Sequence, residues 1–94
     1  MTKRALLLLG QIIATPKVMS LIQQHKCSHD LYHLLLRHQI GDWGNVCSED
    51  KESNEQGLIE QLRIISSYIL VQNIVWIITE ADRSITTVLL PDEY

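Results

Sequence analysis

Charged and hydroxyl side chains gather at one point near the C-terminus, between two apolar runs. In the segment VWIITEADRSITTVLLPDEY, residues 75–80 and 85–90 each consist mainly of Ile, Val, Leu and Thr. Alternation with a period of two is typical of pleated strands, so the segment predicts a β-hairpin. Its turn would carry the groups with the most chemical potential in the chain: Glu80, Asp82, Arg83 and Ser84.

A small nuclease site is one chemistry that these residues could perform. His38 or Glu80 would act as the general base, without a metal ion. Arg63 and Arg83 would bind the phosphate as its charge develops. Small ribonuclease toxins place such groups on an antiparallel sheet beside helices, which is an analogy at the level of the fold. The structural alternative is a Glu80–Arg83 pair in the turn, with Arg63 paired to an acid of the third predicted helix.

A zinc site is a second candidate. His29 and His33 are four residues apart in a predicted helix, and Cys27 or Cys47 could add a thiolate. No known ligand spacing fixes a set of four, and exposed helical histidines explain the same pattern. The sequence therefore predicts no metal and no cofactor.

A third candidate is an acidic binding surface, whose alternative is simply a solvated face. Between Glu49 and Gly57 the chain has no apolar residue, which indicates that this stretch of a helix lies at the surface. The expected partner-binding residues are the acids of this helix, the loop before it, the hairpin turn and the C-terminal tail: Asp42, Trp43, Glu49, Asp50, Glu52, Glu55, Asp82, Arg83, Asp92 and Glu93.

Charge is distributed unevenly along the chain. Residues 1–40 contain five Lys or Arg and one acid, for a net charge of +4, whereas residues 41–94 contain three bases and ten acids, for −7. A nucleic-acid-binding protein is expected to carry a strong basic stripe. The C-terminal half is better suited to a basic protein partner, and direct nucleic-acid binding is not expected.

The elements that must position these residues begin with a strand within residues 6–14. Thr15 and Pro16 predict the cap and the first position of a helix that reaches about Gln24. A second helix is expected from a cap at Ser28 to Gly41. A third begins at Ser48 and gains an inward apolar face only at Leu58, Ile59 and Leu62.

A strand over residues 63–71, a turn at Gln72–Asn73 and the hairpin complete the chain. The prediction is one two-layer α+β domain over residues 1–94, with an N-terminal strand and two or three helices packed on a three-stranded antiparallel C-terminal meander. The meander is apolar on both faces, as Ile77 and Ile78 illustrate, and the helices cover only one. A homodimer is therefore expected.

The chain is expected in the cytoplasm. Cys27 and Cys47 lack a CxxC spacing and are expected to be reduced thiols. The start MTKRALLLLGQIIA imitates a signal peptide, but Gly10 and Gln11 interrupt its apolar run. No apolar run is long enough to span a membrane.

Three segments, LGQIIATP, RHQIGDWG and WIITEADRSITTVLLPDEY, carry a resemblance that covers nearly the whole chain. The chain resembles a family of small bacterial proteins found on plasmids and integrated elements, usually labelled plasmid-related or hypothetical and sometimes restriction–modification components. The resemblance implies a cytosolic bacterial setting and carriage on a mobile element. It brings no settled activity.

These observations predict an accessory protein of a mobile element that is not an enzyme. The expected activity is counter-defence inhibition of the anti-CRISPR or anti-restriction type, through an acidic surface that binds a basic, nucleic-acid-binding host complex. The alternative is a small metal-independent ribonuclease of the toxin type, using His38, Arg63, Glu80 and Arg83.

Overall fold

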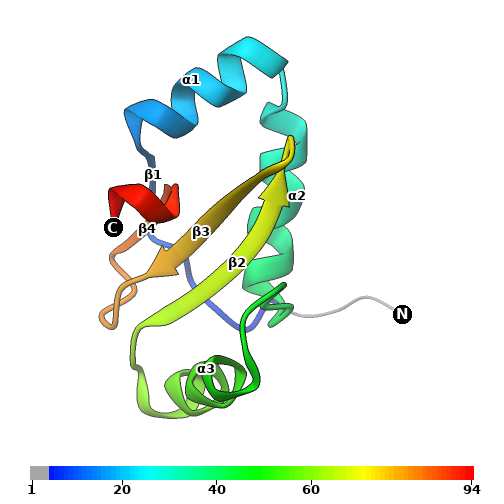
Figure 1. The fold of residues 1–94 in the computed structure, drawn as a ribbon. Coiled ribbons are helices and arrows are strands. Elements are labelled where there is room, and N and C mark those ends of the chain that lie inside the picture. The colour runs from blue at the N-terminus through cyan, green and yellow to red at the C-terminus, as the bar shows by residue number, and fades with distance from the viewer. Residues whose placement is uncertain (1–4) are drawn as a thin grey trace.

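The computed structural model describes residues 5–94 and shows an α+β domain, as the sequence predicts. The described residues form three α-helices, a four-stranded sheet and a short C-terminal 3-10 helix, arranged as in Figure 1. In chain order the elements are β1 (Gln11–Ala14), α1 (Pro16–His25), α2 (Ser28–Gln39), α3 (Ser48–Glu60), β2 (Ile64–Leu70), β3 (Asn73–Thr79), β4 (Ile85–Leu89) and η1 (Pro91–Glu93).

The strands form one sheet in the order β1-β4-β3-β2. The predicted meander is present, since β2 pairs with β3 and β3 with β4 in antiparallel fashion. β1 joins the sheet as well, parallel to β4, through bonds such as the one from the Thr15 amide to the Val88 carbonyl, 3.1 Å. The sheet is therefore mixed, with β1 and β2 at its edges.

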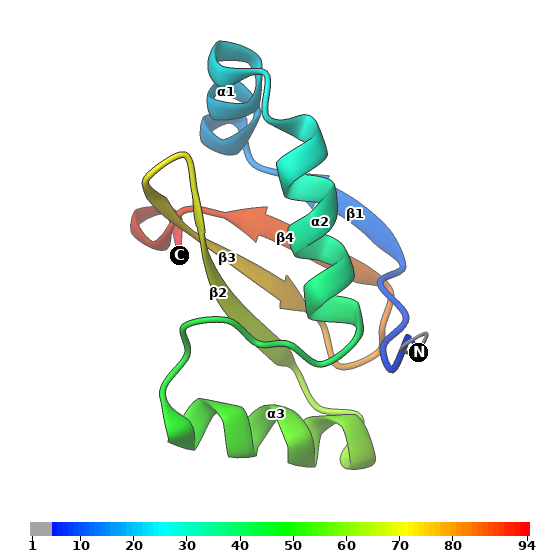
Figure 2. The same cartoon turned by 90° about the vertical axis from the view of Figure 1, so that its right-hand side faces the viewer.

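Helix α2 covers one face of the sheet, which we call the inner face. Figure 2 shows α2 crossing this face, with α1 beyond one end and α3 beyond the other. Leu31, Leu34 and His38 are its buried residues and repeat at helical spacing. Leu31 and Leu34 belong to one core cluster with strand side chains, namely Tyr68, Leu70, Val75, Ile77 and Val88. His38 bonds Ser66 and Thr79, and Ile64 packs in a second cluster with Leu7 and Trp43.

The helix boundaries follow the sequence signals with one exception. Thr15 caps α1 as predicted, its hydroxyl accepting a 3.4 Å hydrogen bond from the Val18 amide, and Pro16 takes the first position. The predicted cap at Ser28 is wrong, because Ser28 is already helical and Cys27 occupies the cap position without a side-chain bond. Cys27 is buried in the core, so packing rather than capping sets this boundary.

The turn between β2 and β3 lies one residue earlier than predicted. Val71 and Gln72, rather than Gln72 and Asn73, form it, with φ angles of 48° and 64°. A left-handed conformation at both central residues is the geometry that matches the twist of a two-residue hairpin. A β-branched residue adopts it at a cost, and the Asn73 side chain supports it by donating a 2.7 Å hydrogen bond to the Val71 carbonyl.

Most of the β2 edge is closed by the chain itself. The Ser67 carbonyl accepts a bond from the Asn45 amide at 2.7 Å, and the side chain of Asn54 bonds both the amide and the carbonyl of Ile65. Gly44 allows this approach: its φ is 73°, and a Cβ there would lie 2.0 Å from the Ser67 carbonyl oxygen. Closing an edge in this way prevents unwanted strand pairing.

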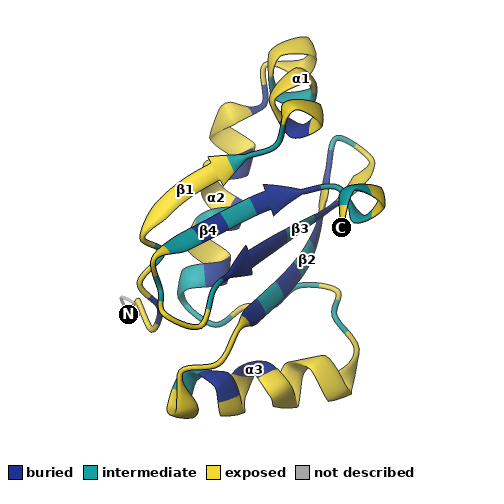
Figure 3. Ribbon diagram, turned by 90° about the vertical axis from the view of Figure 1, so that its left-hand side faces the viewer, coloured by how far each residue is buried: buried dark blue, intermediate teal, exposed yellow. Residues whose placement is uncertain are grey.

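Within residues 5–94, no α-helix covers the opposite, outer face of the sheet, although η1 contacts β3 and two residues of this face, Ile78 and Leu89, are buried. Figure 3 shows this face, with β1 exposed along its whole length apart from its last residue. Three of the isoleucines on this face, Ile13, Ile69 and Ile74, are 39%, 55% and 50% exposed. Trp76 is only half-buried, and the C-terminal Tyr94 packs against it. An exposed apolar face next to a free edge strand is the kind of surface that a second chain can bury.

We expect the chain to form a homodimer through the β1 edge and the outer face beside it. Light scattering at micromolar concentration should give a dimer, and Ile13→Lys should shift it to a monomer because a charge cannot be buried unpaired. Ile59→Lys, at a more exposed isoleucine on α3, outside the outer face, should leave the dimer intact. A monomeric parent protein would contradict this prediction.

Candidate functional site

A chain of buried hydrogen bonds runs through the core beneath the hairpin turn. The two ring nitrogens of His38 bond the Ser66 hydroxyl at 2.6 Å and the Thr79 hydroxyl at 2.8 Å. Thr79 contacts the Thr86 hydroxyl at 2.8 Å, and Thr86 donates to the Leu9 carbonyl at 2.7 Å. His38, Ser66, Thr79 and Thr86 are all fully buried. These hydrogen bonds thus connect α2 with three strands and with the segment before β1.

The direction of these bonds fixes a proton on Nε2 of the histidine, and burial sets the charge of the ring. Because the proton of Thr86 points to a carbonyl, Thr79 must donate to Thr86 and accept from His38 Nε2–H. The Ser66 hydroxyl can either donate to Nδ1 or accept from it, so the charge of the ring is decided by its pKa. Burial, with the charge of Arg83 adding to it, lowers the pKa of His38 from 6.5 to about 4. His38 is therefore a polar core residue.

The nuclease residues lie around the same turn but do not form an open site. His38 has no exposed surface with which to reach a substrate proton. Arg63 and Glu80 form a half-exposed ion pair at 3.5 Å, and Arg63 also donates a 2.7 Å bond to the Tyr94 hydroxyl. The expected partner of Arg63, an acid of the third helix, is thus replaced by Glu80.

Arg83 has a structural task. One guanidinium nitrogen donates to the Leu62 carbonyl at 2.7 Å and the Glu80 carbonyl at 3.2 Å, and the other donates to the Gly57 carbonyl at 2.9 Å. Gly57 lies in the last turn of α3 and Leu62 just after the helix, and the Gly57 carbonyl also accepts a 3.0 Å bond from the Leu62 amide. Arg83 therefore holds the β3–β4 turn against α3. The predicted side-chain pair between Glu80 and Arg83 is not formed, because the Glu80 carboxylate pairs with Arg63.

Helix α3 presents the acidic surface. Only Asn54 and Gly57 are buried in it, so the helix meets the sheet through small or polar residues. The expected inward positions at Ile59 and Leu62 are wrong, since these residues are 79% and 48% exposed. The acids Glu49, Asp50, Glu52 and Glu55 are all exposed, and within residues 5–94 none of them takes part in a salt bridge.

The other predicted partner-binding residues are elsewhere or are engaged within the chain. Asp42 pairs with Arg37 at 2.7 Å, and Trp43 is buried with its indole donating to Glu55 at 3.1 Å. In the tail, Asp92 pairs with Lys17 of α1 at 3.0 Å. The other predicted residues also form hydrogen bonds within the chain. Asp82 bonds Ser84, and Glu93 bonds Thr15 and Leu90. The structure therefore gathers the α3 acids, while Asp92 and Glu93 of the tail bond other parts of the chain.

The histidines of the zinc candidate touch each other. Their Nε2 atoms are 3.1 Å apart on the exposed side of α2, and the rings meet edge to face. Cys27 is buried in the core. Among the described residues, no group of three or more His, Cys, Asp or Glu side chains is placed to hold a metal ion.

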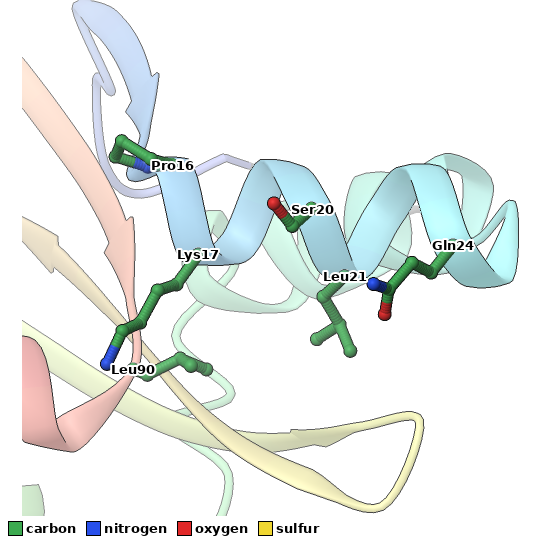
Figure 4. A pocket seen from close by; sticks show the side chains of 6 residues that line it. All are labelled: Pro16, Lys17, Ser20, Leu21, Gln24 and Leu90. Atoms are coloured by element: carbon green, nitrogen blue, oxygen red, sulfur yellow. The ribbon is translucent and has the colours of Figure 1, made fainter.

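Two hollows on the surface could accept a ligand. One is a shallow groove between α1 and the residue before η1, lined by Pro16, Lys17, Ser20, Leu21, Gln24 and Leu90. Figure 4 shows Lys17, Leu21 and Gln24 on the side of α1 nearest Leu90. The second lies between the segment before α3 and the outer face of the sheet, and its walls include Asp50, Trp76 and Tyr94. The second hollow adjoins the acidic helix.

Comparison with known proteins finds no matching family model, no matching curated protein and no matching solved structure. None of the helices in the described part of the chain has the length and apolar character needed to cross a lipid bilayer.

The buried hydrogen bonds of His38 and the second hollow were not predicted from the sequence. The strand period alone places each hydroxyl residue on the same face as an apolar residue two positions away: Ser66 with Ile64, Thr79 with Ile77, and Thr86 with Val88. Which face is buried against His38 depends on α2, which is distant in sequence. The hollow likewise combines three separate segments.

Stability should depend on pH through His38. Its pKa is lower in the folded chain than the ordinary 6.5, so the unfolded chain binds more protons between pH 6.5 and about 4. The free energy of unfolding should therefore fall as the pH drops through this window, by on the order of 3 kcal/mol. Urea unfolding at several pH values measures this fall.

His38→Gln keeps a donor and an acceptor but cannot titrate, so this extra fall should disappear. The control is His33→Gln, which removes an exposed histidine of the same helix. Equal pH profiles for the parent and His38→Gln would show that the neutral buried imidazole does not exist.

Removing Arg83 should cost stability. Arg83→Ala leaves carbonyls at the end of α3 without their charged donor, so we expect a loss of about 2 kcal/mol in the free energy of unfolding. Arg63→Ala removes an exposed ion pair and should cost less than about 1 kcal/mol. A nuclease would behave differently: both variants would lose RNA cleavage, and neither would need to lose stability.

Proposed function

We propose that this chain is a non-enzymatic, cytoplasmic protein-binding protein whose acidic helix α3 binds a basic protein surface. The observation that supports this proposal is the state of the α3 acids. Glu49, Asp50 and Glu52 are exposed and have no hydrogen bond or ion pair within residues 5–94, so internal contacts do not neutralise their charge.

The position of α3 suits it to contact. The helix lies beyond one end of the sheet and is fastened there through Asn54, Gly57 and the Arg83 guanidinium. Because these contacts use one side of the helix, the opposite side is free along its length. That side also carries Ile59, 79% exposed, which offers an apolar contact within the charged surface. A rigid acidic helix steers a basic partner and fixes its orientation.

The biological setting comes from the sequence resemblance. Carriage on a bacterial mobile element implies an advantage in a host that attacks foreign DNA. The defence complexes that do so bind nucleic acid through basic grooves, which are the surfaces an acidic helix can occupy. We therefore propose counter-defence inhibition, of the anti-CRISPR or anti-restriction type, as the role of the binding surface.

The nuclease alternative has less support in the geometry. A general base must reach the proton that it abstracts, and His38 is enclosed by Ser66 and Thr79. Arg83 uses both terminal nitrogens of its guanidinium on backbone carbonyls. Arg63 and Glu80 remain at the surface as an ion pair, which is insufficient to describe a site.

The proposal is tested by protection of a plasmid. A host with an active CRISPR or restriction system is transformed with a targeted plasmid, with and without expression of the chain. Expression should raise the transformation efficiency, and Glu49→Lys with Glu52→Lys should abolish the rise. Both residues are exposed, so the double variant should change the free energy of unfolding by less than about 1 kcal/mol. Glu55 is left intact because it accepts a bond from buried Trp43.

The control changes the net charge equally at another place. Gln23→Lys, His25→Lys and Asp30→Lys alter exposed positions of α1 and α2 and should leave protection unchanged. If the α3 variant protects as well as the parent, the helix is only a solvated face. RNA cleavage by the purified chain, lost in Arg63→Ala, would instead support the nuclease.

A further inference from the structure

The hollow beside α3, which we call the Trp76 pocket, is built by three separate parts of the chain. Its volume is about 340 Å³, within the range of small-ligand sites. The segment before α3 supplies one wall and the outer face of β2 and β3 supplies the floor. Figure 3 shows β2, α3 and the C-terminal turn on this side of the molecule. The lining residues are Asn45, Val46, Cys47, Asp50, Ile65, Ser67, Trp76 and Tyr94.

Three polar side chains line this pocket and form no hydrogen bonds within the described residues. The side chains of Asn45, Asp50 and Ser67 form no hydrogen bond with any residue in 5–94, although Ser67 is half-buried. Together they offer a carboxylate, a hydroxyl and an amide oxygen, all of which accept hydrogen bonds. The Ser67 hydroxyl and the Asn45 amide can also donate, but the Asp50 carboxylate only accepts, and its charge favours a cationic ligand that donates.

Two aromatic rings form the other side of the pocket. The rings of Trp76 and Tyr94 meet edge to face with their centroids 5.5 Å apart. The Tyr94 ring already has a guanidinium over it, since the Arg63 Cζ atom lies 5.5 Å from the ring centroid. This internal contact shows that the aromatic cluster accommodates a planar cation. The charge of Arg63 is balanced by Glu80, so it does not exclude a second cation.

We propose that the Trp76 pocket binds the guanidinium of an arginine side chain on the basic partner. The inference rests on the proposed function, because it names the group that this partner inserts beside α3. The cation lies against the Trp76 ring, donates to the Asp50 carboxylate, and donates its remaining N–H groups to Ser67 and Asn45.

Other ligand classes fit the pocket less well. A guanidinium only donates hydrogen bonds and is flat, which matches a set of acceptors beside an aromatic wall. A lysine ammonium has the same charge but cannot stack as a plane. A nucleotide could stack on Trp76, but its phosphate would be repelled by Asp50 and by the exposed acids Glu49 and Glu52 of the same helix.

The test uses nuclear magnetic resonance of the intact chain, which has two tryptophan indole signals. Arginine and lysine, each capped as the N-acetyl amide, are added in separate titrations. The Trp76 indole should shift with arginine at least about threefold more tightly than with lysine. The indole signal of Trp43, which is buried and donates to Glu55, should stay in place and reports that the fold is intact.

Two neutralising variants separate the pocket from the general charge of the helix. Asp50→Asn should weaken arginine binding by about tenfold, because a charge-assisted hydrogen bond is lost. Glu49→Gln, the neighbouring acid with the same loss of charge, should change it by less than about twofold. Equal effects of the two variants would overturn the proposal, as would a Trp76 signal that arginine does not move or that adenosine moves more tightly.

The plasmid assay separates this inference from the proposed function. If Asp50→Asn and Trp76→Leu lose protection while Glu49→Gln retains it, the pocket is part of the contact. If Glu49→Lys with Glu52→Lys abolishes protection but both pocket variants retain it, the acidic helix is the interface and the arginine pocket is wrong. Full protection by all of these variants would reject the proposed function itself.

Discussion

The buried hydrogen-bond chain from Leu9 to Ser66 is the constraint on which the rest of the structure depends. It joins α2 to β2, β3 and β4 and to the segment before β1, all through groups that would be costly to bury unpaired. Because each hydroxyl has one proton to donate, the bonds point in one consistent direction, and a shifted strand register would break them. These hydrogen bonds thereby fix which face of the sheet turns its hydroxyl groups toward α2. The opposite face becomes the outer face.

A second set of polar contacts holds α3 where apolar packing would be insufficient. Asn54 bonds the backbone of Ile65, Gly57 permits close approach to Ile64, and Arg83 bonds the carbonyls at the helix end. These contacts need only a narrow strip of the helix. Glu49, Asp50 and Glu52 take no part in these contacts, and their lack of internal side-chain partners is what supports the proposed role in binding. An apolar strip would have buried more of the helix and removed part of this surface.

Local patterns predicted the parts of the fold that depend on neighbouring residues. The alternation in residues 75–90 predicted the hairpin, and Thr15 with Pro16 predicted the start of α1. The roles of His38, Trp43 and Arg83 were not predictable in the same way. Each is a residue type common at functional sites, and only distant partners in the chain (Ser66, Glu55 and Gly57) make them structural. The parallel pairing of β1 with β4 joins residues far apart in the sequence. An alternating pattern predicts that a strand forms but not which strand it pairs with.

The candidate site follows from how the β2 edge is closed. A sheet edge can be protected by a charge or a proline, but here a loop containing Gly44 lies beside it and continues directly into α3. This arrangement places the first turn of an acidic helix next to the outer face of β2 and β3, where Trp76 and Tyr94 meet. The same backbone contacts that keep the sheet from pairing wrongly therefore create the Trp76 pocket. The polar side chains that line the pocket are not needed to protect the edge, because backbone atoms of the loop already do so. Since these side chains have no structural role there, we assign them to the binding of a partner.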